Sequence, residues 1–458
     1  MSLVFFWQEM DARTLHLAYG RTAFEAIASR GEIPQKLSPC FPKPARDIRH
    51  LVQQSLLRPI DSVPVKNLVS AGERAVIIIS DSTRASASDV ILPILVEQLN
   101  SAGIPDDNID IVVALGIHRP QTEEEKRTLT GRSIFDRIRV FNHDAYDSKN
   151  LVSIGTTSRG TPVSISRIVA EADRIITVGS VVPHYFAGFG GGRKSIMPGI
   201  CSHEANLRSH FLVFDKVRGR NPSAKTAQLA GNPVHEDMLE AAEMIAPDFT
   251  INSVLTPEKE LCAVFAGELV RAHQEACASY LQHFSTVVST AGDLTIVDCG
   301  GHPKDINFIQ AHKAIQSAYS ITRRGGWMIV LAECPEGFGY PGFVDWFRYN
   351  SIGEFERALR RNYEIYGQTA YAMYEKATSV NIVLVSDLAP QLVERMSMHA
   401  APTFDEAYAL AAGNLGEDFT TYVIPASSAS LFHTRAEHEE AVISVKRYRN
   451  GNGEKNVS

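Results

Sequence analysis

Residues 175–210 read IITVGSVVPHYFAGFGGGRKSIMPGICSHEANLRSH. The first four residues, 175–178, are apolar or β-branched and show no polar alternation, which predicts a strand that is buried in a parallel sheet. The loop that follows contains Gly190 to Gly192 in succession, and glycines reach positive φ and let a ligand approach the main chain. Arg193 and Lys194 come next. The stretch therefore predicts a cradle of backbone N–H groups and positive charge for a phosphate or a carboxylate.

This loop is not a P-loop of the form GxxxxGK[ST]. That motif requires glycine before its lysine, and Arg193 stands before Lys194. The mismatch argues against an ordinary ATP or GTP site but leaves an anionic ligand open. A flexible glycine-rich surface loop is the alternative interpretation, although such loops seldom carry histidine, arginine and lysine so close together.

A second apolar run, 76–79, predicts another buried strand. Four polar residues follow it: Asp81, Ser82, Thr83 and Arg84. Residues just past the carboxyl end of a strand are where α/β sheets place ligands. The aspartate can accept from a ribose hydroxyl, the two hydroxyl residues can bond a phosphate, and the arginine can clamp a carboxylate or phosphate bidentately. Capping of the next helix by Asp81 or Ser82 is the alternative.

A third buried strand is predicted within 109–115, and it leads to Gly116 and His118. A histidine beside glycine at a strand end is placed to meet a ligand, but many such histidines are structural. A helix is also predicted over 232–245, with Asn232 as its N-cap and Pro233 at its first position. We expect His235, in the same turn, to lie on the surface.

The strand-then-helix order begins again near residue 286, which predicts an α/β protein of two α/β domains with a ligand cleft between them. We expect the first domain at 1–285 and a smaller one at 286–430, with the segment from about 430 to 458 packing back on the first. In the second domain Gln310 and Lys313 share a helix face and can bind a carboxylate, or form a solvated face.

The composition limits the partners of the chain. Its 458 residues carry a formal net charge of −7, which disfavours nucleic acid or an anionic membrane as the main partner. No apolar run approaches the length of a membrane helix, and the N-terminus lacks the basic region of a signal peptide. Six cysteines without CxxC pairing fit a reduced, cytoplasmic protein with a small soluble substrate.

Four motifs together resemble the nickel-dependent lactate racemase family. They are Asp81-x-Thr83-Arg84, Gly116-x-His118-Arg119, the loop from Pro183-His184 to Gly-Gly-Arg193-Lys194-Ser195, and Gln310-x-x-Lys313. The resemblance implies His118 and His184 as the catalytic acid/base pair and His210 as the metal ligand. It implies that the cofactor is bound by Asp81, Ser82, Thr83, Arg84 and Lys194. It further implies that the substrate is bound by Arg84, Gln310 and Lys313.

The same resemblance implies a racemase or epimerase of a 2-hydroxy acid. The implied reaction is reversible hydride transfer to a nickel pincer nucleotide, Ni(II)-pyridinium-3,5-bisthiocarboxylic acid mononucleotide, which the family joins to the lysine that Lys194 matches. Histidine suits the proton transfer because its usual pKa is about 6.5. Cofactor-biosynthesis proteins are the implied partners for loading. Where the lactate enzyme has a pocket tryptophan this chain reads GQTAYAMY, with Tyr371, so a larger or more polar 2-hydroxy acid is expected.

Two other classes of function remain as alternatives. A conventional NAD-dependent dehydrogenase is disfavoured because no GxGxxG follows a predicted strand. A non-catalytic protein that binds a small carboxylate or a phosphorylated ligand could use the same residues. Substitution of the two histidines distinguishes an enzyme from a binding protein, because in an enzyme His118→Ala and His184→Ala change only turnover.

Overall fold

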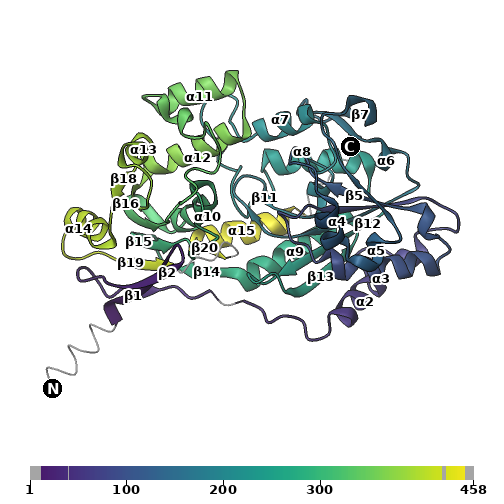
Figure 1. Ribbon diagram of the computed structural model, residues 1–458, viewed down its shortest axis with the longest axis horizontal. Coiled ribbons are helices and arrows are strands. Elements are labelled where there is room, and N and C mark those ends of the chain that lie inside the picture. The colour runs from purple at the N-terminus through teal and green to yellow at the C-terminus, as the bar shows by residue number, and fades with distance from the viewer. Residues whose placement is uncertain (1–11, 40, 425–429, 449–458) are drawn as a thin grey trace, which may run out of the picture. The chain divides into compact units, whose positions relative to one another are not determined.

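The computed structural model describes residues 12–39, 41–424 and 430–448. The chain divides into two compact units, of which unit 1 comprises residues 1–40 and 284–439, and unit 2 comprises residues 41–283 and 440–458. Each unit has its own sheet of largely parallel strands, flanked in sequence by helices (Figure 1). The prediction of an α/β protein with two α/β domains is confirmed.

Unit 2 is built on a six-stranded sheet in the order β13-β12-β9-β4-β5-β6. The strands are β4 (Ala75–Ser80), β5 (Ile109–Ala114), β6 (Arg139–Asn142), β9 (Arg174–Ser180), β12 (Phe249–Leu255) and β13 (Leu261–Gly267). All neighbours are parallel except β12 and β13. Because β5 and β6 follow β4 on one side while β9 and β12 lie on the other, the strand order reverses between β4 and β9. Such a switch point is the usual ligand site of an open α/β sheet.

The helices of unit 2 alternate with these strands along the sequence. They are α2 (Ile48–Leu57), α3 (Ser88–Ser101), α4 (Glu123–Thr130), α5 (Arg132–Phe135), α6 (Arg167–Ala170), α7 (His203–Phe211), α8 (Pro233–Ile245) and α9 (Leu269–Phe284). Ile77 and Ile79 of β4 are fully buried and share one core with Leu92 and Leu95 of α3. The β-branched strands are therefore covered by helices, as their lack of polar alternation requires.

Helix α8 confirms one local prediction and corrects another. Asn232 caps the helix by accepting from the backbone N–H groups of Val234 and His235, and Pro233 occupies the first turn. His235, however, was predicted to lie on the surface and is fully buried. Its ring lies 4.5 Å from the ring of Tyr448, between centroids, so a contact from the far end of the chain covers it.

Unit 1 contains a fully parallel six-stranded sheet in the order β18-β17-β16-β15-β19-β3. Its strands are β3 (Gln35–Lys36), β15 (Gly292–Asp298), β16 (Thr322–Leu331), β17 (Asn381–Val385), β18 (His399–Ala401) and β19 (Thr421–Ile424). Its helices are α10 (Phe308–Tyr319), α11 (Ile352–Arg361), α12 (Ile365–Ser379), α13 (Pro390–Arg395) and α14 (Phe404–Leu415). A short parallel pair, β14 (Ser285–Val288) with β20 (Leu431–Thr434), completes it.

The first 40 residues depart from the prediction that 1–285 forms one domain. The hairpin of β1 (Thr14–Tyr19) and β2 (Thr22–Ile27) belongs to unit 1, where Leu15 and Leu17 join the core around Leu294 and Ile329. Strand β3 pairs with β19 of the same unit. These partners lie hundreds of residues away in the sequence, so local patterns gave no indication of them.

The end of the chain is divided between the units. Strand β20 belongs to unit 1, whereas helix α15 (Arg435–Arg447) belongs to unit 2 from Glu440 onward. There Ser444 Oγ accepts from the N–H of Leu229 at 2.8 Å, and Gln274 Nε2 donates to the carbonyl of Val445 at 2.8 Å. Of the segment from about 430 to 458 that was predicted to pack on the first domain, residues 449–458 lie outside the described residues.

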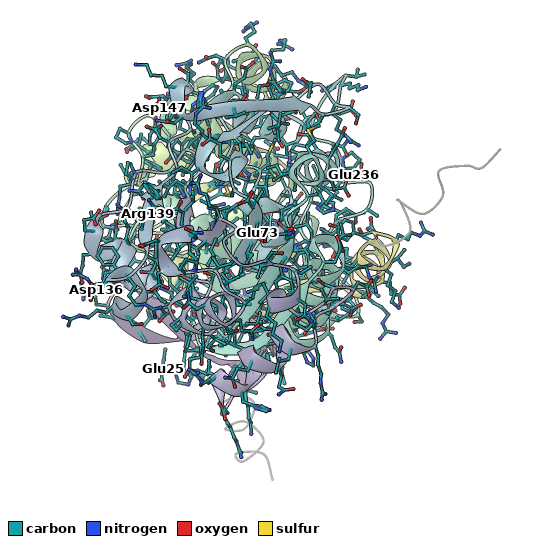
Figure 2. All side chains as sticks on the ribbon, turned by 90° about the vertical axis from the view of Figure 1, so that its right-hand side faces the viewer. Glu25, Glu73, Asp136, Arg139, Asp147 and Glu236 are labelled. Atoms are coloured by element: carbon teal, nitrogen blue, oxygen red, sulfur yellow. The ribbon has the colours of Figure 1, made fainter. Side chains whose placement is uncertain are left out.

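Several surface charges of unit 2 form ion pairs. Three that are labelled in Figure 2 illustrate this: Glu73 bonds Arg174 at 2.8 Å, Arg139 bonds Asp110 at 2.8 Å, and Glu236 bonds Arg159 at 2.5 Å. Among the helices of the described residues, none combines the length and the apolarity that a membrane crossing demands.

The assignment of the N-terminal hairpin to unit 1 is testable with Leu17→Ala. Leu17 is about 1% exposed, so the cavity left by the substitution is expected to cost about 2–5 kcal/mol of unfolding free energy. Native-state hydrogen exchange is expected to show lost protection in β15 and β16, with β4 and β9 unchanged. Leu56→Ala, a fully buried site in unit 2, is the matched control with the reverse pattern. Loss of protection in β4 for Leu17→Ala would contradict the assignment.

Candidate active site

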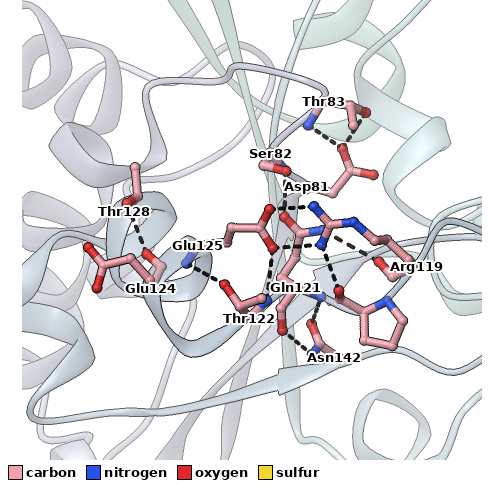
Figure 3. A network of polar contacts seen from close by, with 11 residues as sticks. Asp81, Ser82, Thr83, Arg119, Gln121, Thr122, Glu124, Glu125, Thr128 and Asn142 are labelled. Carbon is pink, nitrogen blue, oxygen red and sulfur yellow. Dashed lines mark hydrogen bonds and ion pairs between the residues drawn. The ribbon is translucent and has the colours of Figure 1, made fainter.

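Three segments of unit 2 meet at the switch point between β4 and β9. Asp81 follows β4 directly, His118 lies in the turn after β5, and the glycine-rich loop follows β9. Gln121 ties two of these ends together, because its Oε1 accepts from the N–H of Ser82 at 3.1 Å while Asn142 at the end of β6 bonds its backbone (Figure 3). The residues that follow β4, β5 and β9 are thus gathered at one edge of one sheet.

Asp81 and His118 form a hydrogen-bonded pair. Oδ2 of Asp81 lies 2.5 Å from Nδ1 of His118, and Oδ1 accepts from the N–H and the hydroxyl of Thr83 at 2.9 and 2.6 Å. Burial raises the pKa of Asp81, but the hydrogen bonds from His118 and Thr83 outweigh it, so the pKa lies below its usual value. The group is a carboxylate that only accepts, so Nδ1 of His118 carries a proton, and in the neutral imidazole the lone pair lies on Nε2.

The two members of this pair differ in exposure. The side chain of Asp81 is 2% exposed, whereas that of His118 is 48% exposed. A buried carboxylate that orients an accessible imidazole is a common arrangement around catalytic histidines. Asp81 was predicted to contact the cofactor, yet both of its oxygens are engaged by Thr83 and His118.

The glycine-rich loop is folded back on the core of unit 2. It begins with a short hairpin of β10 (Pro183–His184) and β11 (Gly188–Phe189) and continues into the 3-10 turn η4 (Gly192–Ser195). A Cβ on Gly191, where φ is +74°, would come within 2.8 Å of Asn252 Oδ1, and one on Gly192 would come within 2.9 Å of the His273 ring. Only glycine fits this path of the backbone.

Arg193 does not belong to the predicted anion cradle. Its side chain is about 1% exposed, and its Nη2 donates to the carbonyl of Ala187 at 2.7 Å. Its Nη1 lies 3.4 Å from the carbonyl oxygens of Gly190 and Gly191. The guanidinium is therefore directed inward and bonds the loop itself. The sequence prediction failed because two adjacent basic residues, 193 and 194, leave a tight turn in different directions.

Lys194, by contrast, lies in a cluster of positive groups. Burial, followed by the charges of Arg84 and Arg193, holds the pKa of Lys194 well below its usual range. Burial and then the charges of Lys194 and Arg84 likewise hold the pKa of His184 well below its ordinary value. Among the ion pairs of the described ranges, none involves Arg84 or Lys194. Positive groups gathered without a carboxylate partner form a site for an anion.

His210, near the end of α7, is buried beside this cluster. Its Nδ1 donates to the carbonyl of Asn206 at 2.7 Å, which leaves Nε2 as the nitrogen with a lone pair. Burial, helped by the charge of Lys194, lowers the pKa of His210 to about 4. Its ring packs edge-on against Phe186 at 5.2 Å, and Lys194 Nζ lies 6.0 Å from the centre of the same ring. A neutral imidazole with one lone pair fixed in place is a good metal ligand.

The remaining predicted residues have different surroundings. Ser82 and Arg84 are exposed beyond β4. Arg119 is held by Glu125 in a bidentate pair at 2.6 and 2.8 Å (Figure 3), so it is not a free cation. In unit 1, Gln310 and Lys313 are exposed on α10, with Lys313 Nζ 2.8 Å from Gln310 Oε1. Tyr371 is 2% exposed and packs against Phe355, so it is a core residue of unit 1.

Sequence reasoning missed three residues that shape the site. Phe186 packs beneath Lys194 and His210, and Asn252 accepts from the N–H of Gly192 at 2.8 Å. His273 Nε2 bonds the carbonyl of Gly190 at 2.8 Å. One signal was present, because an asparagine within the buried strand at 249–255 needs a polar partner.

Comparisons with known proteins give one consistent result. Residues 19–221 match the family described as Lactate racemase N-terminal domain, and residues 287–431 match Lactate racemase C-terminal domain. The lactate racemase of Lactiplantibacillus plantarum is 34% identical over 385 residues, covering 82% of this chain and 88% of that protein. The lactate racemase of Thermoanaerobacterium thermosaccharolyticum is 34% identical over 298 residues, covering 65% and 68%.

The fold agrees with a solved structure of the second relative. The lactate racemase apoprotein from T. thermosaccharolyticum superposes with a TM-score of 0.80 at 27% sequence identity, over 92% of this chain and all of that one. Both sequence and fold therefore point to the same family.

The lowered pKa of His210 predicts a pH dependence of stability. Between about pH 6.5, the value of an unperturbed histidine, and about pH 4, the unfolded chain binds a proton here that the folded chain does not. The free energy of unfolding therefore falls as the pH drops through this window, by at most about 1.4 kcal/mol per pH unit for one site.

His210→Asn tests this contribution, because asparagine keeps a donor for the carbonyl of Asn206 but binds no proton. Urea unfolding at pH 6.5, 5.5 and 4.5 is expected to give a shallower loss of stability for the variant than for the wild type. An equally steep loss in both proteins would show that His210 is not held neutral.

Proposed function

The chain belongs to the lactate racemase family, and from this premise we propose that it racemises or epimerises a 2-hydroxy acid with a nickel pincer nucleotide bound at the switch point of unit 2. One observation carries the proposal: Arg84, Lys194 and the histidines His118, His184 and His210 lie near one another in unit 2, and burial together with the basic neighbours disfavours the protonated forms of Lys194, His184 and His210. Such a site suits a phosphorylated, anionic cofactor together with a carboxylate substrate.

The donor groups of unit 2 fit this cofactor. No group of three or more His, Cys, Asp or Glu side chains could hold a metal ion within the part of the chain that the structure describes, so a nickel ion needs ligands from elsewhere. His210 offers a single neutral nitrogen, since Nδ1 is engaged by Asn206. A pincer nucleotide, which brings its own sulfur and carbon ligands, needs one such protein ligand. When bound, it supplies the acceptor and donor of the substrate hydride.

Lys194 is the proposed point of attachment. Burial and the charges of neighbouring cations lower the pKa of Lys194, which favours the neutral amine, the nucleophilic form of a lysine. Arg84 lies close enough to act on the charges of both Lys194 and His184, so it is available to a phosphate or a carboxylate. Ser82 and Thr83, exposed beside it, are proposed to bond the nucleotide.

The two histidines are proposed to move the proton of the substrate hydroxyl. His118 can accept it at Nε2, because Asp81 holds the proton of Nδ1 and stabilises the imidazolium that forms. His184 serves the opposite enantiomer from a different segment of the site. Two bases from separate segments suit a reaction that must run in both stereochemical directions.

Arg84 of unit 2 is proposed to bind the substrate carboxylate, and in unit 1 Gln310 and Lys313 are the proposed carboxylate-binding residues. The contact between Lys313 Nζ and Gln310 Oε1 orients the ammonium on the exposed face of α10. A carboxylate held by charged donors gains about 1.5–3 kcal/mol per bond. Tyr371, which stands where the lactate enzyme has its pocket tryptophan, is buried against Phe355 in unit 1, and a substrate other than lactate stays part of the proposal.

Loading and turnover test the proposal directly. Protein co-produced with the cofactor-making proteins of the family is expected to show a mass increase of nucleotide size at Lys194 and about one nickel per chain. A chiral panel of 2-hydroxy acids is then expected to reveal at least one that loses its optical purity. His118→Ala and His184→Ala are expected to lower kcat by about 10²–10⁴ while the adduct remains. Loaded protein that binds a 2-hydroxy acid without any turnover would favour the alternative of a carboxylate-binding protein.

Asp81→Asn tests the pairing with His118. The neutral amide cannot stabilise the imidazolium. Its NH2 group can also donate to Nδ1, which places the ring proton on Nε2, where it blocks the accepting nitrogen. We expect kcat to fall about tenfold or more, with little change in KM. The double variant with His118→Ala is expected to be no slower than His118→Ala alone, because the two residues act as one unit. Additive losses would show that Asp81 acts on the cofactor instead.

A further inference from the structure

We infer that Arg193 is a positioning residue, whose buried guanidinium anchors the glycine-rich loop and thereby turns Lys194 toward His184 and His210. This inference rests on the proposed function only for the role of Lys194. The anchoring itself follows from the contacts of the loop in unit 2.

The guanidinium gathers oxygens from three residues of the loop. Nη2 donates to Ala187 at 2.7 Å, and Nη1 is 3.4 Å from the carbonyls of both Gly190 and Gly191. Arginine suits this task because its planar fork presents several donors in fixed directions. Three carbonyl groups of the loop therefore surround the guanidinium of Arg193. The position of Arg193 in turn determines the direction in which the side chain of Lys194 leaves the backbone.

Two further side chains fix the same turn from the core. Asn252 Oδ1 accepts from the N–H of Gly192 at 2.8 Å, and His273 Nε2 bonds the carbonyl of Gly190 at 2.8 Å. Burial, followed by the charge of Arg193, lowers the pKa of His273 to about 3, so the ring stays neutral beside the guanidinium. Arg193, Asn252 and His273 thus form an inner anchor that leaves η4 one orientation.

The consequence for Lys194 follows from the geometry of η4. Adjacent residues of a helical turn point in clearly different directions. With Arg193 buried inward, Lys194 leaves the turn elsewhere, and it lies over the ring of Phe186 among the groups of the site. A flexible loop would lose conformational entropy each time the cofactor is attached. Because the anchor already orders the loop, this entropic cost does not arise on attachment.

Arg193→Met and Arg193→Lys test the inference. Methionine keeps the length of the side chain without donors, whereas lysine keeps the charge and part of the donation. In cofactor-free protein, hydrogen exchange of the peptide 186–197 is expected to be at least tenfold faster in Arg193→Met. When the proteins are co-produced with the cofactor-making proteins, the fraction of chains with an adduct at Lys194 is expected to fall at least fivefold in Arg193→Met and to be partly restored in Arg193→Lys.

Arg174→Met is the matched control. Arg174 is a partly buried arginine at the start of β9, paired with Glu73 and Asp248, so its loss destabilises unit 2 away from the loop. Adduct formation and exchange of 186–197 are expected to stay within twofold of wild type in this variant. If Arg193→Met does not fold, Asn252→Ala removes the second anchor and is expected to change both readouts in the same direction.

The outcomes separate the inference from the proposed function. The inference is overturned if wild type and Arg193→Met form the adduct at Lys194 to the same extent, or if their hydrogen exchange in the peptide 186–197 is equally fast. Wild type that forms no adduct, under conditions in which a known lactate racemase loads, overturns the proposed role of Lys194. In that case the exchange of the cofactor-free variants still decides for or against the anchor.

Discussion

The parallel pairing of β4 with β9 is the constraint on which the site of unit 2 depends. Ile77 lies opposite Ile176 in this pair, and the apolar side chains of both strands are buried by helices. Once the two strands lie side by side with the same direction, their carboxyl ends must open at the same edge of the sheet. Asp81, which follows β4, and the glycine-rich loop, which follows β9, are therefore adjacent. The chemistry is placed by the core, because the core fixes which strands are neighbours.

The second feature of the site is its electrostatic imbalance. Several basic side chains elsewhere in unit 2 pair with carboxylates, as Arg174 does with Glu73 and Asp248. At the switch point the buried carboxylate of Asp81 is hydrogen-bonded to His118. Burial and positively charged neighbours lower the pKa of Lys194. Gathering like charges without a counter-ion costs free energy, and a protein keeps such a cluster when a bound anion repays it. The destabilised arrangement is thus itself an argument for an anionic cofactor and substrate.

The sequence predicted the elements of this fold better than the contacts between distant segments. The run at 175–178 had to be a buried strand, because four consecutive apolar or β-branched residues leave no polar face. The N-terminal hairpin was assigned to the wrong unit, because Leu17 finds Leu294 only after the chain has folded. Arg193 and Lys194 looked alike as neighbouring basic residues, and only the carbonyl oxygens around Arg193 distinguish them. The family resemblance supplied residue roles, whereas the partner of His118 came from the structure.

The two proposed acid/base histidines are prepared in different ways. His118 is hydrogen-bonded at Nδ1 to the carboxylate of Asp81, which orients its ring before any ligand binds. His184 accepts on Nδ1 from the N–H of Ala187 at 3.3 Å, and burial together with the charges of Lys194 and Arg84 disfavours its protonated form. An anionic ligand that neutralises these charges also removes their effect on the imidazole. Binding of the anion and protonation of His184 are therefore linked, since each makes the other more favourable. In the proposed racemase the bound cofactor and substrate would make the second histidine competent, while Asp81 does so for the first.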